Sequence, residues 1–144
     1  MSYLLDTNIL SELVRQKPEK SVIEWVQAIP TEHLYISVLT LGELRHGVEK
    51  LSERKRKETL SLWLENDLRI WFQNRVLAIS SDVADKWGHL LAKMKRPLPV
   101  VDSLLAATAL HHDLKVVTRN EKDFSYPGLE IINPFKKARC ASQF

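Results

Sequence analysis

The chain has 144 residues, a formal net charge of +3, a pI near 9.0 and a single cysteine. This length fits one domain with its own core, and the contents of hydrophobic (44%) and charged (27%) residues are typical of a globular protein. The lone cysteine excludes an internal disulfide and a cysteine metal cluster. No apolar run approaches the roughly 18 residues of a membrane span, and no basic segment precedes the first apolar run, so we expect a cytoplasmic protein without a signal peptide.

The first predicted element is a buried strand at residues 3–5, which ends at Asp6. An amphipathic helix follows at 9–15, with Thr7 or Asn8 suited to cap its first turn. In an open α/β sheet, ligands bind at the carboxyl ends of the strands. Asp6 is therefore expected at that edge, where a carboxylate is a natural ligand for a hard cation.

A second helix is predicted after Pro18, then a short β-branched and aromatic strand at 34–37. The next helix is expected to begin at Thr40, with Glu43 in its first turn. These two residues match a capping box, in which the Glu43 carboxylate would bond backbone amides. In the alternative interpretation, Glu43 points across the strand ends toward Asp6.

A charged stretch at 52–57 precedes a long helical pattern at 60–72, and a third strand is predicted at 76–79. A helix capped by the run at 80–82 follows and ends near Met94. The charged stretch is either a solvated helix face or a contact for nucleic acid phosphates. Its basic residues are Arg54, Lys55, Arg56 and Lys57.

Asp102 opens a helix whose small side chains, through residue 110, allow close packing on a sheet. The Asp102 carboxylate either interacts favourably with the helix dipole or belongs to a functional site. Strands are predicted at 115–117 and 130–132, and between them lies a polar turn at 118–124 that contains further acids. Residues 1–133 are expected to form one domain, and 134–144 a basic tail that is loosely ordered.

The alternation of strands and helices predicts a parallel sheet with helices on both faces. Asp6, Glu43, Asp102 and the turn with Asn120 and Asp123 would then lie near one edge. Crowded carboxylates repel one another, and divalent cations relieve that repulsion. Oxygen-only ligands favour Mg²⁺ or Mn²⁺, and a basic protein with such a pocket is typical of a nuclease.

Four segments of the chain resemble PIN-domain endoribonucleases, specifically the VapC-like toxins of toxin–antitoxin pairs. They occur in the order and spacing of that family, and the resemblance covers nearly the whole chain. The segments are Leu5-Asp6-Thr7-Asn8, Thr40-Leu41-Gly42-Glu43-Leu44, Asp102-Ser103-Leu104-Leu105-Ala106-Ala107-Thr108-Ala109 and Thr118-Arg119-Asn120-Glu121-Lys122-Asp123-Phe124.

The resemblance implies an α/β fold, a Rossmann-like three-layer sandwich with a five-stranded parallel sheet. It also implies metal-dependent cleavage of single-stranded RNA, with transfer RNA as one candidate substrate. The implied partners are a second copy of the chain, an inhibitory antitoxin and, through the antitoxin complex, operator DNA. No membrane partner is expected.

The resemblance also assigns the site. Asp6, Glu43 and Asp102 match the three core acids of the family. The fourth acid falls at Asn120 or Asp123 in similar proteins; because position 120 is an amide here, Asp123 is the expected acid and Asn120 a polar helper. The expected supporting residues are Thr7, Asn8 and Thr118, with the two threonine hydroxyls orienting water or ligands.

The corresponding mechanism is a hypothesis. Asp6, Asp102 and Asp123 would hold Mg²⁺ or Mn²⁺, and Glu43 would bind a metal or its water. A metal-activated water would attack the phosphodiester in line, leaving 5′-phosphate and 3′-hydroxyl ends.

Two other classes of protein deserve comparison. A haloacid-dehalogenase-like phosphatase would carry a second acid where this chain has Asn8, which argues against that class. A non-catalytic binding module, acting with its antitoxin in a DNA-binding complex, is the main alternative. In that case the acids would be helix caps, and metal would not affect thermal stability.

Overall fold

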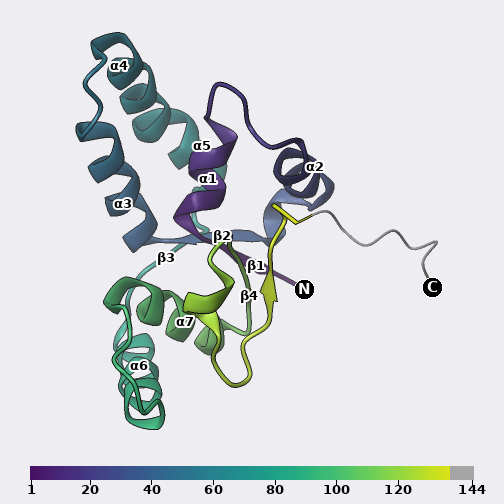
Figure 1. Ribbon diagram of the computed structural model, residues 1–144, viewed down its shortest axis with the longest axis vertical. Helices are drawn as coiled ribbons and strands as arrows, with labels where there is room; N and C mark the ends of the chain where they lie inside the picture. Colours follow the sequence, from purple (N-terminus) through teal and green to yellow (C-terminus); the bar gives the residue numbers. More distant parts are fainter. Residues whose placement is uncertain (137–144) are drawn as a thin grey trace, which may run out of the picture.

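A parallel sheet of five short strands forms the middle layer of the protein (Figure 1). The structure is a computed structural model and describes residues 1–136. Within these residues the strand order is β3-β2-β1-β4-β5, and every pairing is parallel. This confirms the predicted fold class. The strands are β1 (Tyr3–Leu5), β2 (Leu34–Ser37), β3 (Val76–Leu77), β4 (Lys115–Val117) and β5 (Ile131–Ile132).

The central strand β1 lies where the strand order reverses. From β1 the chain proceeds outward to β2 and β3, then crosses to the other side of β1 to form β4 and β5. Leu5 pairs with Val117, so Asp6 and Thr118 leave neighbouring strands at the same level. A reversal of this kind opens a crevice at the carboxyl ends of the strands, the usual ligand site of open α/β sheets.

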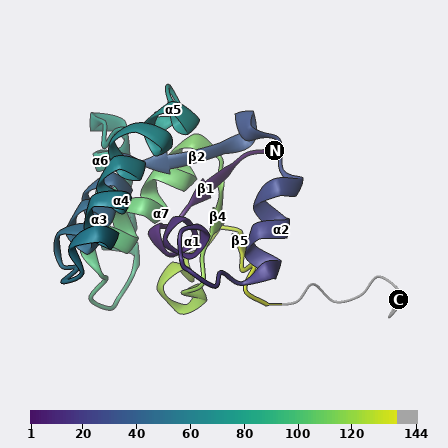
Figure 2. The same cartoon turned by 90° about the horizontal axis from the view of Figure 1, so that it is seen from above.

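Helices cover both faces of the sheet, giving three layers (Figures 1 and 2). One face packs through Leu5 and Val117, whereas the opposite face packs through Leu4 and Val116. This alternation follows from the two-residue period of strands. The first face carries α1 (Thr7–Leu13), α2 (Lys20–Ala28), α3 (Val38–Glu49), α4 (Arg54–Leu62) and α5 (Leu68–Phe72), and the second carries α6 (Ser81–Lys93) and α7 (Val100–His112).

Two helices begin earlier than predicted. Helix α1 starts at Thr7, and its cap is Asp6 itself, whose side chain accepts from the Thr7 amide. Helix α3 starts directly after β2 and is capped by Ser37, whose hydroxyl accepts from the Leu39 amide. The predicted capping box at Thr40 is therefore wrong, and Glu43 lies beyond the first turn of its helix.

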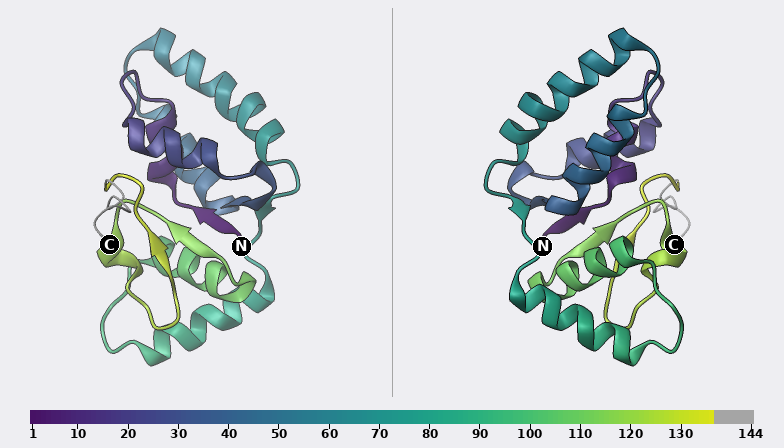
Figure 3. Two further views of the ribbon diagram at one scale, coloured as in Figure 1. Left: turned by 90° about the vertical axis from the view of Figure 1, so that its right-hand side faces the viewer. Right: turned by 90° about the vertical axis from the view of Figure 1, so that its left-hand side faces the viewer.

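The charged stretch after α3 is helical as well. Glu53 caps α4, and its carboxylate accepts from the amides of Lys55 and Arg56. A π-helical turn (Trp63–Asp67) joins α4 to α5, so the chain is helical from residue 54 to 72. This helical arm projects beside α3, as the side views show (Figure 3).

Two short 3₁₀ turns complete the described chain, η1 (Thr31–His33) and η3 (Glu121–Phe124). Within residues 1–136, no helix combines the length and apolarity needed to traverse a bilayer. Of the predicted tail at 134–144, residues 137–144 lie outside the described part of the chain.

Candidate active site

Asp6 is the best-anchored acid at the carboxyl edge of the sheet. Its side chain is 5% exposed. One carboxylate oxygen accepts from the Thr7 amide at 2.8 Å; the other accepts from the Thr118 hydroxyl at 2.8 Å and from Asn8 Nδ2 at 3.2 Å. Burial raises the pKa of Asp6, and these three hydrogen bonds oppose that rise by favouring the charged form.

The supporting residues join the ends of β1 and β4. Thr118 is fully buried, and besides donating to Asp6 its hydroxyl accepts from the Asn120 amide at 2.9 Å. The Asn8 side chain accepts from the Arg119 amide at 3.2 Å. These bonds hold the turn after β4 against the start of α1. The predicted supporting residues Asn8, Thr118 and Asn120 therefore meet in one network.

Glu43 reaches the same edge from α3. It is exposed, and its Oε1 accepts from the Thr7 hydroxyl at 2.6 Å. Thr7 follows Asp6 directly, so this bond brings Glu43 beside the end of β1. The negative charge of Glu43 raises the pKa of Asp6 further. Of the two interpretations of Glu43, the structure thus agrees with the one in which it points toward Asp6.

Asp102 lies in the first turn of α7 and is half-buried. Its pKa is raised from 3.8 to about 6, first by burial and then by the charges of Asp6, Asp123 and Glu43. The first turn of α7 is held by Ser103, whose hydroxyl accepts from Trp87 Nε1 at 2.9 Å and donates to the Val100 carbonyl. Carboxylates from four separate segments therefore share one electrostatic environment.

Asn120 and Asp123 occupy different places in this environment. Both belong to the turn after β4, and the Asp123 amide donates to the Asn120 carbonyl at 3.1 Å. Asn120 lines the cleft described below, whereas in the described chain Asp123 is absent from that lining but close enough to raise the pKa of Asp102.

Asp6, Glu43 and Asp102 line an open cleft of about 390 Å³. Sequence reasoning missed the part of its wall that lies beside α1 and the turn after β4. The lining residues comprise Asp6, Thr7, Asn8, Ser11, Glu12, Arg15, Glu43, Asp102, Arg119, Asn120 and Phe135. Glu12 and Arg15 are three positions apart in the helix predicted at 9–15, a spacing that favours an ion pair, although in the structure Arg15 lies beyond the end of α1. Arg119 lies within one of the four segments that carry the family resemblance.

The side chains are not arranged as a closed metal site. Among residues 1–136, no three His, Cys, Asp or Glu side chains stand close enough together to hold one metal ion. The acids share a cleft and influence one another's charge, while Glu43 is engaged by the Thr7 hydroxyl.

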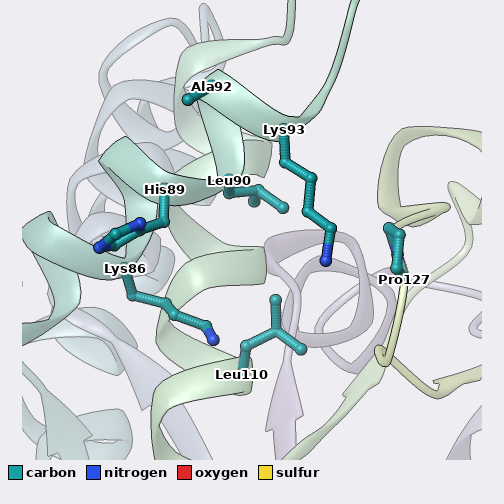
Figure 4. Close-up of a pocket in the computed structure, with 7 residues that line it drawn as sticks. All are labelled: Lys86, His89, Leu90, Ala92, Lys93, Leu110 and Pro127. Carbon is teal, nitrogen blue, oxygen red and sulfur yellow. The ribbon is translucent and has the colours of Figure 1, made fainter.

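A larger hollow of about 530 Å³ lies elsewhere, between α6, α7 and the turn near Pro127 (Figure 4). Lys86, His89 and Lys93 of α6 surround it, together with Leu110. None of the described residues that line this hollow is a carboxylate, so they do not supply the groups that the predicted chemistry needs. The acidic cleft is the better candidate despite its smaller volume.

The fold and the cleft define a class of protein: an α/β sandwich with a cluster of acids where the strand order reverses. Residues 3–128 match the PIN domain family. Since this match spans most of the 144 residues, the chain belongs to the PIN-domain family.

Relatives of known description extend over nearly the whole chain. It is 36% identical to a protein described as VapC ribonuclease Y4jK from Sinorhizobium fredii, over 94% of this chain and 99% of that one. It is 33% identical to a protein described as Toxin FitB from Neisseria gonorrhoeae, over 92% of this chain and 97% of that one.

Solved structures agree with this placement. A structure described as FitAB bound to an IR36 DNA fragment superposes with a TM-score of 0.85 at 30% identity, covering 93% of this chain and 96% of that one. A structure described as a toxin–antitoxin complex from Klebsiella pneumoniae superposes with a TM-score of 0.67 at 30% identity, covering 92% and 98%. The predicted family resemblance is confirmed.

Proposed function

We propose that this protein is a metal-dependent endoribonuclease, the toxin of a toxin–antitoxin pair, which cleaves single-stranded RNA in the cytoplasm. The observation that carries the proposal is the meeting of Asp6, Glu43 and Asp102 in one cleft at the carboxyl edge of the sheet, with Asp123 near enough to raise the pKa of Asp102. The full-length similarity to proteins described as a VapC ribonuclease and as a toxin supports the same function.

The proposed cofactor is Mg²⁺ or Mn²⁺, because the available ligands are carboxylate, amide and hydroxyl oxygens. Burial is the main cause of the raised pKa of Asp102, and repulsion from Asp6, Asp123 and Glu43 adds to it; a cation would relieve that repulsion. Glu43 would exchange its hydrogen bond with Thr7 for the shared ion. A bound divalent cation would lower the pKa of the attacking water and stabilise charge on the phosphate.

The residues of the cleft would have separate roles in binding the cation. Asp6 is held in one orientation by the Thr118 hydroxyl and the Thr7 amide, so it is the preorganised ligand. Glu43 and Asp102 would supply further ligand charge from α3 and α7. We assign Asp123 as the fourth acid and Asn120 as a polar helper at the cleft wall.

The proposed partners are an antitoxin, a second copy of the chain and operator DNA bound through the antitoxin complex. The similarity to a DNA-bound FitAB structure and to a toxin–antitoxin complex supports this part of the proposal. The helical arm offers apolar surface for such contacts, since Leu62 and Ile70 are 60% and 67% exposed.

The direct test is to incubate purified protein with total bacterial RNA in Mg²⁺, in Mn²⁺ and in chelator, and to map the product ends. The proposal expects discrete cleavage that requires metal and leaves 5′-phosphate and 3′-hydroxyl ends. Products with 2′,3′-cyclic phosphates would contradict the mechanism. Absence of cleavage and of metal binding by folded protein would favour the non-catalytic binding module.

A further inference from the structure

The acidic cleft has one basic wall, which the proposed metal chemistry does not use. Arg15 follows the end of α1, and Arg119 lies in the turn after β4; both line the cleft together with Asp6 and Asp102. Among residues 1–136, neither arginine forms a salt bridge with Asp6, Glu43, Asp102 or Asp123. Their positive charge is therefore not used to neutralise the proposed metal ligands.

The guanidinium of Arg15 is held by the buried carboxylate of Glu12. The Arg15 Nη1 donates to both carboxylate oxygens of Glu12, at 2.9 and 3.1 Å. Glu12 also accepts from the Glu19 amide at 2.8 Å, and its side chain is 4% exposed against 57% for Arg15. One nitrogen of the guanidinium is thus anchored, while much of the group faces solvent at the cleft wall.

Arg119 is held by different means. Its guanidinium lies 4.9 Å from the centroid of the Phe135 ring, a cation–π arrangement, and its amide donates to the Asn8 side chain. Arg119 is also near enough to Glu12 that its charge contributes to lowering the pKa of that carboxyl. Arg15, Arg119 and the buried Glu12 therefore line the same cleft.

The summed charge of Glu12, Arg15 and Arg119 indicates a binding site in addition to a structural ion pair. A structural pair needs one arginine for Glu12, and Arg15 fills that role. Arg119 adds a second cation, so the group of three residues has a net charge of +1 beside a cluster of acids. Arginine guanidinium groups present planar pairs of donors that match phosphate oxygens.

We propose that Arg15 and Arg119 form a phosphate-binding subsite that holds the RNA backbone next to the phosphate being cleaved. Glu12 and Phe135 act as positioning residues, which orient the two guanidinium groups toward the cleft. This inference rests on the proposed ribonuclease function. The two guanidinium groups attract the RNA backbone to a place beside carboxylates that would otherwise repel it.

The test measures RNA binding separately from cleavage. A short fluorescein-labelled single-stranded RNA is titrated in Mg²⁺ with protein carrying Asp6→Asn, and fluorescence anisotropy gives Kd at several salt concentrations. Arg119→Gln and Arg15→Gln are then added singly. Because Arg15→Gln leaves Glu12 buried without its partner, Glu12→Gln combined with Arg15→Gln provides a second variant, and thermal melts verify folding.

We expect each arginine substitution to weaken RNA binding about ten- to hundredfold, since a charge-assisted hydrogen bond contributes about 1.5–3 kcal/mol. The slope of log Kd against log salt should become shallower by about 0.7 for each lost phosphate contact. Arg15→Lys should restore the slope but not the full affinity, because it keeps the charge without the planar donor pair.

Arg69→Gln is the matched control, because Arg69 is an exposed arginine on α5, which leads into the start of β3 at the edge of the sheet opposite the cleft. It should change Kd less than twofold. Equal weakening by Arg69→Gln, or unchanged Kd and slope in both cleft variants, would overturn the subsite while leaving the ribonuclease intact. Failure of the folded wild-type protein to bind or cleave any RNA would overturn the proposed function and the subsite together.

Discussion

At the scale of single residues, Thr118 shows how a buried hydroxyl organises the site. It donates to Asp6 at 2.8 Å and accepts from the Asn120 amide at 2.9 Å, so it links the ends of β1 and β4. The sequence resemblance identified Thr118 as an orienting hydroxyl, but the bond to Asp6 depends on strand pairing between residues 112 positions apart. The residues next to Thr118 in the sequence therefore do not indicate that its hydrogen-bond partner is Asp6.

Thr118→Val should destabilise the protein by about 1–3 kcal/mol, because it removes a hydrogen bond to a buried carboxylate at nearly constant volume. Urea unfolding measures this as a lower midpoint at constant m. The control is Thr108→Val; Thr108 is equally buried, and its hydroxyl bonds only the Leu104 carbonyl in the same helix. Equal losses in the two variants would contradict the special role of Thr118.

The raised pKa of Asp102 predicts a pH dependence of the metal-free protein. With a pKa of about 6 when folded and 3.8 as the reference, the folded state binds more protons between these values. Stability should therefore fall as pH rises from about 4 to 6. The full difference corresponds to roughly 3 kcal/mol, which solvent screening in the open cleft reduces to about 1–2 kcal/mol.

Asp102→Asn removes this titration. In chelator near pH 7, the variant should be about 1–2 kcal/mol more stable than the wild type, and the two should converge near pH 4. Urea unfolding at both pH values measures the difference. A variant that is less stable than the wild type near pH 7 would show that Asp102 is a structural cap and not a strained ligand.

At the scale of elements, the start of α3 decides where Glu43 lies. The pattern at Thr40 and Glu43 matched a capping box, one of the two interpretations of Glu43, yet the helix begins at Val38 because the strand ends at Ser37, whose hydroxyl caps it. Among the partners that residues 1–136 offer, the buried Thr40 hydroxyl instead finds none for a hydrogen bond. A capping sequence is informative only when the helix boundary is known, and here tertiary packing moved that boundary.

Two substitutions separate these interpretations. Ser37→Ala should cost about 1 kcal/mol through loss of the cap. Thr40→Val should be neutral or stabilising, because it replaces an unpaired buried hydroxyl by a methyl group. Unfolding free energies measure both. A greater loss for Thr40→Val than for Ser37→Ala would restore the capping box.

At the scale of the whole molecule, the alternation of strands and helices sufficed to predict the three-layer fold. The place of Asp6 at the carboxyl edge followed from the strand before it. Glu43 and Asp102 were assigned to the same site by the family resemblance, because Glu43 lies beyond the first turn of α3 and Asp102 belongs to a helix that follows another helix. The basic wall was not predictable, since Arg15 and Arg119 meet only through the crossover that places β4 beside β1. Residues that are brought together only by the strand order, without a local motif, cannot be predicted from the sequence pattern.

Metal binding should stabilise the molecule as a unit. At a concentration of about a hundred times its Kd, Mg²⁺ or Mn²⁺ would add about 2.7 kcal/mol, which for a domain of this size raises Tm by roughly 5–10 °C. Differential scanning fluorimetry with and without chelator measures the shift. The same Tm in metal and chelator would contradict a metal site in the cleft.

The central claim is that Asp6 anchors a catalytic cleft, and one comparison of rates tests it most directly. RNA cleavage in Mg²⁺ is measured for Asp6→Asn beside Asp113→Asn. Asp113 is an exposed residue at the end of α7 with φ of 55°, a conformation that asparagine tolerates. We predict a loss of at least about a hundredfold for Asp6→Asn, since even residues that only support ligands contribute that much. The rate of Asp113→Asn should remain that of the wild type, and equal rates for the two folded variants would contradict the account.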